Sequence, residues 1–297
     1  MPITYTPLRF PGGKSKIYPF VSSLIDTNGL HGCTYAEAFC GGAGLAIKLL
    51  LRGDVSKVVL NDLDPAVYSI WDAVVNRPDE LCKFIQTVPL TMEQWLKCRD
   101  TYRSGDKPSL ELGKAAFFLN RTNRSGILSG GVIGGKKQTG KYRIDARFNR
   151  EGLCQKVRNI STRRCDIELH NLDALEFMRD VAPTLGEASL LYLDPPYVQK
   201  GPALYQNSFT DDAHRRLAGA VRTYDGHWMV TYDTDKLVDD LYAPSGDWKI
   251  TVDEIKVGYS AATARNVARE RLVLGPSLKT PQGKPARHAT SEPVMTP

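Results

Sequence analysis

The sequence lacks the marks of a disulfide-bonded, zinc-binding or membrane-spanning protein. Its six cysteines are scattered, and none forms a Cys-x-x-Cys pair, so neither a disulfide framework nor a zinc site is indicated. No apolar run approaches the ~20 residues that a helix needs to cross a bilayer. Arg9, Lys14 and Lys16 surround two glycines where a signal peptide would have an apolar core. We therefore expect a reduced, cytoplasmic protein that uses no membrane and no metal.

Two common phosphate-binding motifs are absent as well. Residues 8–16 read LRFPGGKSK, and Leu8 stands where a Walker P-loop requires a glycine. Residues 34–51 read TYAEAFCGGAGLAIKLLL, whose glycine spacing differs from GxGxxG and so disfavours a dinucleotide. A strand, a glycine turn and a helix in that order still suit a nucleotide-containing cofactor. The alternative is that the glycines only allow the strand and helix to pack closely.

The pattern of apolar segments predicts an α/β fold. With 297 residues and 42% hydrophobic content, the chain can form one large α/β domain plus a smaller insert. Short apolar runs alternate with helical patterns, which is typical of a parallel sheet. We expect strands at 34–39, 57–60, 167–171, 189–193 and 228–232, antiparallel strands at 248–257 and 271–274, and helices at 17–25, 45–51, 66–75, 81–103, 112–119, 174–181, 212–224 and 234–242.

The most informative stretch is LLYLDPPY at residues 190–197. Two consecutive prolines cannot donate ladder hydrogen bonds, so the buried strand must end at Asp194. Open α/β sheets bind their ligands at the carboxyl ends of such strands. The Asp194 carboxylate and a proline carbonyl can accept hydrogen bonds from an NH2 group, and Tyr197 offers a ring for stacking. The alternative is a strand that ends in a Pro-Pro turn with Asp194 as a cap.

A second acid follows the second predicted strand in the sequence NDLDP. Its distance from the glycine turn suits an acceptor for ribose hydroxyls, and Asp62 is the better candidate. Asp64 precedes Pro65 and could equally cap the helix at 66–75.

A basic segment interrupts the α/β pattern. Residues 121–165 hold twelve Lys or Arg and two acids, a net charge of +10 that leaves −4 for the rest of the chain. Lys binds phosphates, and Arg, Asn and Gln read base edges. The segment therefore predicts a polyanion-binding face, with DNA contacts from Arg121, Asn123, Arg124, Lys136, Lys137 and Lys141. One alternative is that the whole segment is a solvated loop that happens to be basic. Another is that residues 121–124 only pin the insert to the catalytic domain.

Four motifs now occur in a diagnostic order: FPGGK, EAFCGGAG, NDLD and, after the basic insert, DPPY. In this order they resemble the Dam-type, α-group DNA adenine-N6 methyltransferases over roughly residues 7–275. The runs NRTNRSGI and GKYRIDARFN resemble the variable region of phage and restriction–modification members. The chain departs from the family pattern in one extra glycine in FCGGAG and in Phe10, where Trp is common. The recognition segment does not match the GATC readers, so the target sequence stays open.

The resemblance implies a Rossmann-like methyltransferase fold that uses S-adenosylmethionine and methylates a flipped adenine in double-stranded DNA. It implies direct in-line transfer, with Asp194, Pro195, Pro196 and Tyr197 at the target base. It also places Phe10, Lys14, Phe39, Asp62 and Asp194 around the cofactor. Gly41 in the glycine turn and Asp173 after the third predicted strand complete the expected cofactor contacts.

We expect a catalytic domain in two parts, 1–78 and 166–275, around a small, mainly helical target-recognition domain at 79–165. Residues 198–211 are long enough to close over a site, and residues 276–297 have the composition of a disordered tail. The chain is expected to be a monomer or weak dimer. Alternatives are a cytosine-N4 or RNA amino methyltransferase and an inactive DNA-binding relative. Asp194 favours adenine, because Ser-Pro-Pro-Tyr is commoner at cytosine-N4 enzymes and Asn-Pro-Pro-Tyr at RNA and protein amide enzymes.

Overall fold

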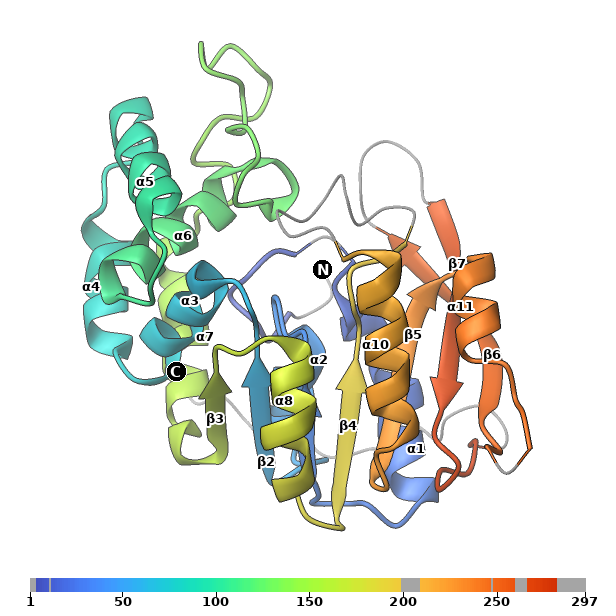
Figure 1. Ribbon diagram of the computed structural model, residues 1–297. Coiled ribbons are helices and arrows are strands. Elements are labelled where there is room, and N and C mark those ends of the chain that lie inside the picture. Colours follow the sequence, from blue (N-terminus) through green and yellow to red (C-terminus); the bar gives the residue numbers. More distant parts are fainter. Residues whose placement is uncertain (1–3, 11, 199–208, 247, 260–265, 282–297) are drawn as a thin grey trace.

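The computed structural model describes residues 4–10, 12–198, 209–246, 248–259 and 266–281 (Figure 1). Its centre is a seven-stranded sheet in the order β3-β2-β1-β4-β5-β7-β6, in which the first five strands are parallel and β7 is antiparallel to both neighbours. The strands are β1 Thr34–Glu37, β2 Lys57–Asn61, β3 Ile167–His170, β4 Ser189–Leu193, β5 His227–Asp233, β6 Thr251–Tyr259 and β7 Asn266–Leu274. The predicted α/β fold with a largely parallel sheet is confirmed.

Helices cover both faces of the sheet, as a doubly wound fold requires. One face packs against α8 Ala174–Asp180, α10 Asp211–Arg222 and α11 Lys236–Leu241. The other packs against α1 Tyr18–Thr27, α2 Gly44–Arg52 and α3 Pro65–Val75. Strand β4 contributes Leu191 and Leu193 to the first core and Leu190 and Tyr192 to the second. Burial on both faces explains why the strand reads as a continuous apolar run.

The strand order reverses between β1 and β4. From β1 the chain moves outward through β2 to β3, then returns to place β4 on the other side of β1. Their register pairs Glu37 with Tyr192, so the residues after both strands emerge next to each other. Such a reversal of strand order is where doubly wound sheets bind ligands.

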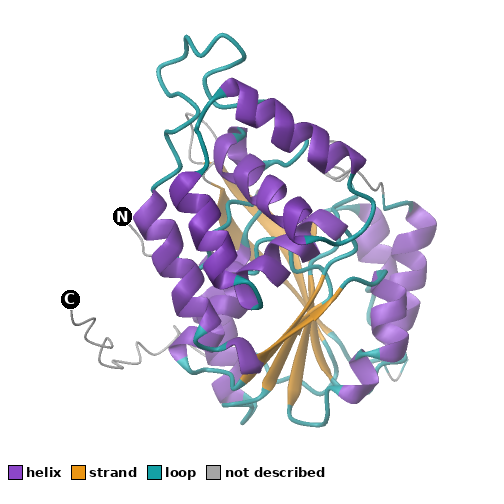
Figure 2. Cartoon of the chain, turned by 90° about the vertical axis from the view of Figure 1, so that its left-hand side faces the viewer, coloured by secondary structure: helices purple, strands orange, loops and turns teal. Residues whose placement is uncertain are grey.

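Four helices lie beside the β3 edge of the sheet (Figure 2): α4 Pro78–Thr87, α5 Met92–Ser104, α6 Leu110–Thr122 and α7 Arg150–Ser161. The prediction of a single helix at 81–103 is wrong, because the structure has two helices there. Helix α4 ends at Thr87, just before Pro89, and α5 starts after the Thr91 N-cap. The buried residues of these helices belong to the same core as α1–α3. The division at 79–165 into a separate domain stays a prediction.

Residues 123–149 form a loop that projects beyond the helices (Figure 1). Apart from the short turn at Arg124–Gly126 it has no helix or strand. We call residues 134–143 the basic loop. Its Lys136, Lys137 and Lys141 are exposed, and Tyr142 beside them is 59% exposed.

The first residues of the predicted tail pack against the domain. Leu278 is buried, and the backbone of Lys279 exchanges two hydrogen bonds with the side chain of Asn28 in α1. The prediction of disorder from residue 276 onward is therefore wrong for residues 276–281, because these contacts hold that stretch against the domain. The remainder of the predicted tail, like most of the predicted closing loop at 198–211, lies outside the described residues. Within the described chain, no helix is long and apolar enough to cross a membrane.

Two glycines in helices give opposite stability predictions. In α6, a Cβ on Gly113 would lie 2.3 Å from the carbonyl oxygen of Ser69, so Gly113 allows α6 to pack closely on α3. In α10, a Cβ on Gly219 would meet nothing within 4 Å. We expect Gly113→Ala to lower the free energy of unfolding by about 1–3 kcal/mol. Gly219→Ala should raise it by about 0.5–1 kcal/mol. Urea denaturation would test both, and equal effects of the two variants would contradict the packing role of Gly113.

Candidate functional site

The glycine turn after β1 is held by residues from two other segments, the N-terminal segment and α3. Gly41 has a φ of 44°, and its carbonyl accepts a hydrogen bond from Trp71 Nε1 at 2.8 Å. The Gly42 carbonyl accepts one from Thr6 Oγ1 at 2.8 Å. The Phe10 ring covers both glycines so closely that an added Cβ would approach it within 3.3 Å at Gly41 and 3.2 Å at Gly42. The FPGGK segment and the glycine turn, predicted separately, therefore form one surface.

Asp62 and Asp64 have different roles. Asp62 accepts hydrogen bonds from the backbone N–H of Gly41 at 2.9 Å and of Asp64 at 3.0 Å. Burial raises the pKa of Asp62 to about 7, against the lowering effect of these two hydrogen bonds. Asp64 accepts from Ala66 N at 2.8 Å and caps α3. Of the two alternatives at this strand end, Asp62 thus lies at the glycine turn and Asp64 is the helix cap.

Asn61, which the sequence reasoning missed, ties together the carboxyl ends of three strands. Its Nδ2 donates to Ala38 O at 2.9 Å and Leu172 O at 3.0 Å, while its Oδ1 accepts from Leu172 N at 3.0 Å. The signal available was an Asn at a strand end, directly before the predicted acid. By fixing the chain after β1, β2 and β3, Asn61 holds Asp62 near the glycine turn.

Asp173 and Phe39 flank this region. Asp173 caps α8 in a reciprocal capping box: its Oδ1 accepts from Leu175 N at 2.8 Å, and its own N–H donates to Glu176. This structural role matches the Asp-x-x-Glu pattern, and a cofactor contact of Asp173 stays a prediction. Phe39 is half-buried and makes an edge-to-face contact with Phe209, with 5.8 Å between ring centroids.

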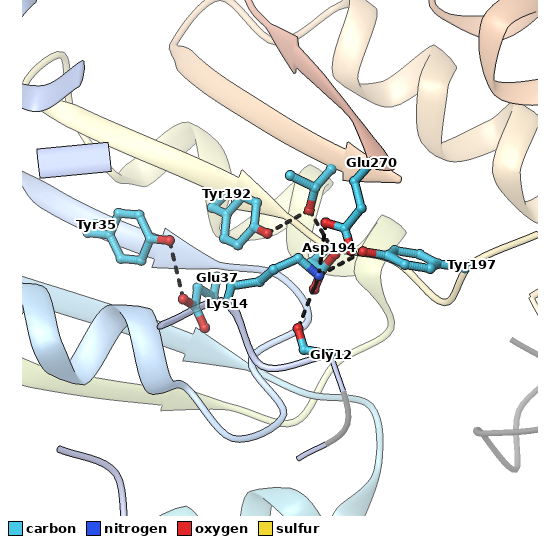
Figure 3. A network of polar contacts seen from close by, with 9 residues as sticks. Gly12, Lys14, Tyr35, Glu37, Tyr192, Asp194, Tyr197 and Glu270 are labelled. Atoms are coloured by element: carbon cyan, nitrogen blue, oxygen red, sulfur yellow. Dashed lines mark hydrogen bonds and ion pairs between the residues drawn. The ribbon is translucent and has the colours of Figure 1, made fainter. Parts of the chain in front are cut away.

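Asp194 follows β4 and is held by two donors (Figure 3). Its Oδ1 accepts from Thr231 Oγ1 at 2.7 Å, and its Oδ2 accepts from Lys14 Nζ at 2.7 Å. Thr231 in β5 is itself 2.6 Å from the Tyr192 hydroxyl. Pro195 is buried, and Pro196 is half-buried after it. The carboxylate is thus oriented by donors from two other segments of the chain, β5 and the FPGGK segment.

The ammonium of Lys14 is surrounded by oxygen atoms (Figure 3), and the residue is buried. Its ammonium donates to the Tyr197 hydroxyl at 2.7 Å and to Gly12 O at 3.2 Å, and it lies 3.7 Å from the Glu270 carboxylate. The Tyr197 ring is 5.0 Å from the same nitrogen. In this structure Tyr197 therefore contacts Lys14.

Three residues at this site, Tyr192, Thr231 and Glu270, were missed by the sequence reasoning. Glu270 is only 1% exposed and pairs in register with Asp233 of β5. Because β7 runs antiparallel to β5, its first half lies at the edge where the parallel strands end. No local sequence signal could have placed it there, since the position depends on the order and direction of the last strands.

Glu37 is a further buried carboxyl group, at the end of β1. The Tyr35 hydroxyl donates to it at 3.2 Å. Burial, together with the charge of Asp194, raises the pKa of Glu37 to about 8, against lowering by the Tyr35 hydrogen bond and Lys14. At pH 7 Glu37 is therefore mostly neutral, and it adds little charge to the Asp194 site.

Asn120 fastens the FPGGK segment to α6. It accepts from the backbone N–H of Arg9 at 2.9 Å and donates to the carbonyls of Arg9 at 2.7 Å and Gly126 at 2.9 Å. Gly126 packs so closely here that an added Cβ would lie 1.9 Å from Arg9 O. The start of the projecting loop and the active-site segment are therefore held together.

The polar residues predicted to contact DNA fall into two groups. Asn123 is fully buried: its amide donates to Ile127 O and Leu128 O at 2.9 Å and accepts from Trp95 Nε1 at 2.7 Å. Arg121 donates to the backbone carbonyls of Pro7 and Arg147. Because their polar groups are paired within the protein, the geometry favours the alternative that these two residues pin the insert, and their contact with DNA stays a prediction.

Arg124, Lys136, Lys137 and Lys141 form the second group, and their side chains are exposed. They lie at the start of the projecting loop and in the basic loop, so they are available to a ligand. Among the described residues there is no group of three or more His, Cys, Asp or Glu that could hold a metal ion.

Solved structures give only weak likenesses. The rRNA methyltransferase aviRa from Streptomyces viridochromogenes is 14% identical, with a TM-score of 0.41 and coverage of 90% of this chain and 86% of that one. The putative methyltransferase yhhF from Escherichia coli is 9% identical, with a TM-score of 0.36 and coverage of 89% and 88%. At such TM-scores no conclusion rests on them.

Two curated proteins show sequence similarity. The chain is 24% identical over 206 residues to the modification methylase LlaI of Lactococcus lactis, which covers 65% of this chain but only 30% of that longer protein. It is 23% identical over 240 residues to the type II methyltransferase M.MjaIII of Methanocaldococcus jannaschii, covering 73% of this chain and 79% of that protein.

The strongest finding is a family model. The model for D12 class N6 adenine-specific DNA methyltransferases matches residues 10–255. This range includes the Phe10 contact with the glycine turn, Asp62 and the sequence Asp-Pro-Pro-Tyr after β4. With a match over most of its length, the chain belongs to the family of D12 class N6 adenine-specific DNA methyltransferases.

Proposed function

We propose that the protein is a site-specific enzyme that transfers a methyl group from S-adenosylmethionine to the N6 amine of adenine in double-stranded DNA. The observation that carries this proposal is Asp194. Its carboxylate follows β4 at the point where the strand order reverses between β1 and β4, and it accepts hydrogen bonds from polar donors. A planar base amine presents the same kind of donor. The two named relatives are methyl-transferring enzymes, which supports the same reading.

The residues around the glycine turn fit an adenosine-containing cofactor. Phe10 and Phe39 provide apolar surfaces, Gly41 allows the turn to approach the Phe10 ring closely, and Asp62 offers carboxylate oxygens to ribose hydroxyls. When bound, S-adenosylmethionine supplies an activated methyl group on a sulfonium. Lys14 follows Phe10 in the same segment and contacts Asp194. We retain Asp173 as a predicted cofactor contact.

Asp194 and the following prolines perform the chemical role. The adenine amine is a poor nucleophile because its lone pair is delocalised into the ring. Accepting its two N–H bonds at Asp194 and at a proline carbonyl directs the lone pair toward the methyl group. Positioning and electrostatics then supply the rate for direct in-line transfer, without a covalent enzyme intermediate. The base must first leave the duplex, at a cost of a few kcal/mol, and stacking on Tyr197 would offset part of it.

Residues 79–165 are proposed as the DNA-recognition part. The exposed lysines of the basic loop and Arg124 provide phosphate and base contacts. Asn123 and Arg121 act indirectly, because they hold the base of the projecting loop in place. All six cysteines are free and five are buried, which fits the reduced, cytoplasmic setting that we propose. We also propose a monomer or weak dimer.

The proposed activity is tested by incubating the protein and unmodified DNA with labelled S-adenosylmethionine. We expect label on adenine N6 at specific sites. Asp194→Ala should lower the rate by at least about a hundredfold, because one positioned electrostatic group is typically worth that much. The thermal unfolding midpoint serves as the control for folding. Label on cytosine N4, or on RNA in place of DNA, would overturn the assigned substrate.

Asp62 and Asp64 give a matched pair for the cofactor site. Asp62→Ala should weaken S-adenosylmethionine binding by about tenfold or more, equivalent to ~1.4 kcal/mol. Asp64→Ala should leave the affinity within about threefold and cost about 1 kcal/mol of stability through the lost α3 cap. Calorimetric titration and urea unfolding measure the two quantities. Unchanged affinity in the Asp62 variant would remove this residue from the cofactor site.

The lysines of the basic loop give a salt-dependence prediction. Changing Lys136, Lys137 and Lys141 to Gln should flatten the log–log dependence of DNA affinity on salt by up to about three units, since each lost phosphate contact removes ~0.9. A control variant changes Lys57, Lys236 and Lys279 to Gln, which removes the same charge elsewhere. If both triple variants show the same slope, the basic loop is not the DNA contact.

A further inference from the structure

The ammonium of Lys14 occupies the place on Asp194 that the proposed function reserves for the target amine. Thr231 already donates to Oδ1 of Asp194, so Oδ2 is the oxygen that an incoming amine would use. That oxygen is 2.7 Å from Lys14 Nζ, and Tyr197, the proposed stacking partner of the base, is bound to the same nitrogen. Lys14 therefore acts as a stand-in for the amine while the site holds no base.

The ammonium and the reacting amine cannot share Asp194 during methyl transfer. The amine becomes more positive as it attacks, and the methyl donor is itself a cation. An ammonium on the same oxygen would oppose this charge and would weaken the hydrogen bond that activates the amine. Lys14 must therefore move away from Asp194, but its side chain is only 6% exposed. A buried cation that leaves one anion needs another close by.

Glu270 supplies that second anion. Its carboxylate is 3.7 Å from Lys14 Nζ, within ion-pair range but beyond hydrogen-bond range, and its side chain is 1% exposed. It comes from β7, on the far side of β5 from the β4 strand that ends at Asp194. A shift of Lys14 by about 1 Å would bring the pair to the ordinary distance of a charge-assisted hydrogen bond.

We propose that Glu270 is a positioning residue for methyl transfer: it receives the Lys14 ammonium when the target amine displaces it from Asp194. The inference rests on the proposed function, because the exchange requires an amine donor. One ammonium between two buried carboxylates keeps a partner in both positions, so the buried charge is never left unpaired. Glu270 touches neither base nor cofactor in this exchange and acts through Lys14.

The kinetic test compares variants on a duplex that the wild-type protein methylates. Glu270→Gln removes the charge and preserves the shape, and we expect at least a tenfold fall in kcat/KM for DNA. Glu270→Asp, which keeps a carboxylate, should retain more activity than Glu270→Gln. Glu254→Gln is the matched control, because it removes a negative charge from an exposed ion pair with Arg269 on the same hairpin. It should change kcat/KM by less than about twofold.

The same substitution in a Lys14→Gln background separates positioning from a general structural role. Without the ammonium there is nothing to exchange, so adding Glu270→Gln should cost less than about twofold. An equal cost in both backgrounds, or a fully active Glu270→Gln protein, would overturn the inference. Thermal unfolding of each variant identifies any loss that comes from folding alone.

A structure of the wild-type protein with the target duplex and a non-reactive cofactor analogue provides the direct test. We expect Lys14 Nζ within ~3.2 Å of Glu270 and more than ~4 Å from Asp194, outside ion-pair range. An ammonium that still contacts Asp194 beside the flipped base would refute the exchange. A wild-type protein that methylates no DNA would instead refute the proposed function, so the two failures are distinguishable.

Discussion

The pairing of the partly buried Asp194 carboxylate with donors from other segments is the interaction around which the active-site end of this fold is arranged. A carboxylate after a strand buried on both faces needs donors, and these come from distant parts of the chain. Lys14 is 180 residues away in sequence, and Thr231 belongs to the next parallel strand. Both donors stabilise the partly buried carboxylate by hydrogen bonds. The site therefore depends on the packing of the FPGGK segment onto the sheet.

The FPGGK segment links three functions that the sequence presents as separate. Phe10 lies on the glycine turn, Lys14 reaches Asp194, and Arg9 is held by Asn120 of α6. Asn120 also binds Gly126 at the start of the projecting loop. A few consecutive residues therefore contact the proposed cofactor surface, the proposed target site and the base of the proposed DNA-binding loop.

The polar residues of the basic segment fall into two groups: buried residues that hold the loop in place and exposed residues that are available to a ligand. Asn123 resembles a base-reading residue in the sequence, yet all its polar atoms are used to hold the loop against α5 and to close a turn. Lys136, Lys137 and Lys141 have no such burial. An amide side chain costs free energy when buried without partners, so its complete pairing identifies a structural role. The positive charge of the segment remains available because it is carried mainly by exposed side chains.

The sequence by itself determined what depends on local pattern: the alternation of strands and helices, the end of β4 at two prolines, the glycine turn, and the four motifs that name the family. It left Asp62 and Asp64 only partly distinguished, because an acid before a helix suits a cap and a ligand equally well. Only the tertiary structure decided that Asp64 caps α3, that Asn123 is buried, and that Glu270 faces Lys14. These outcomes depend on strand order and on the antiparallel direction of β7, which bring together residues far apart in sequence, and such long-range contacts leave no local pattern to read.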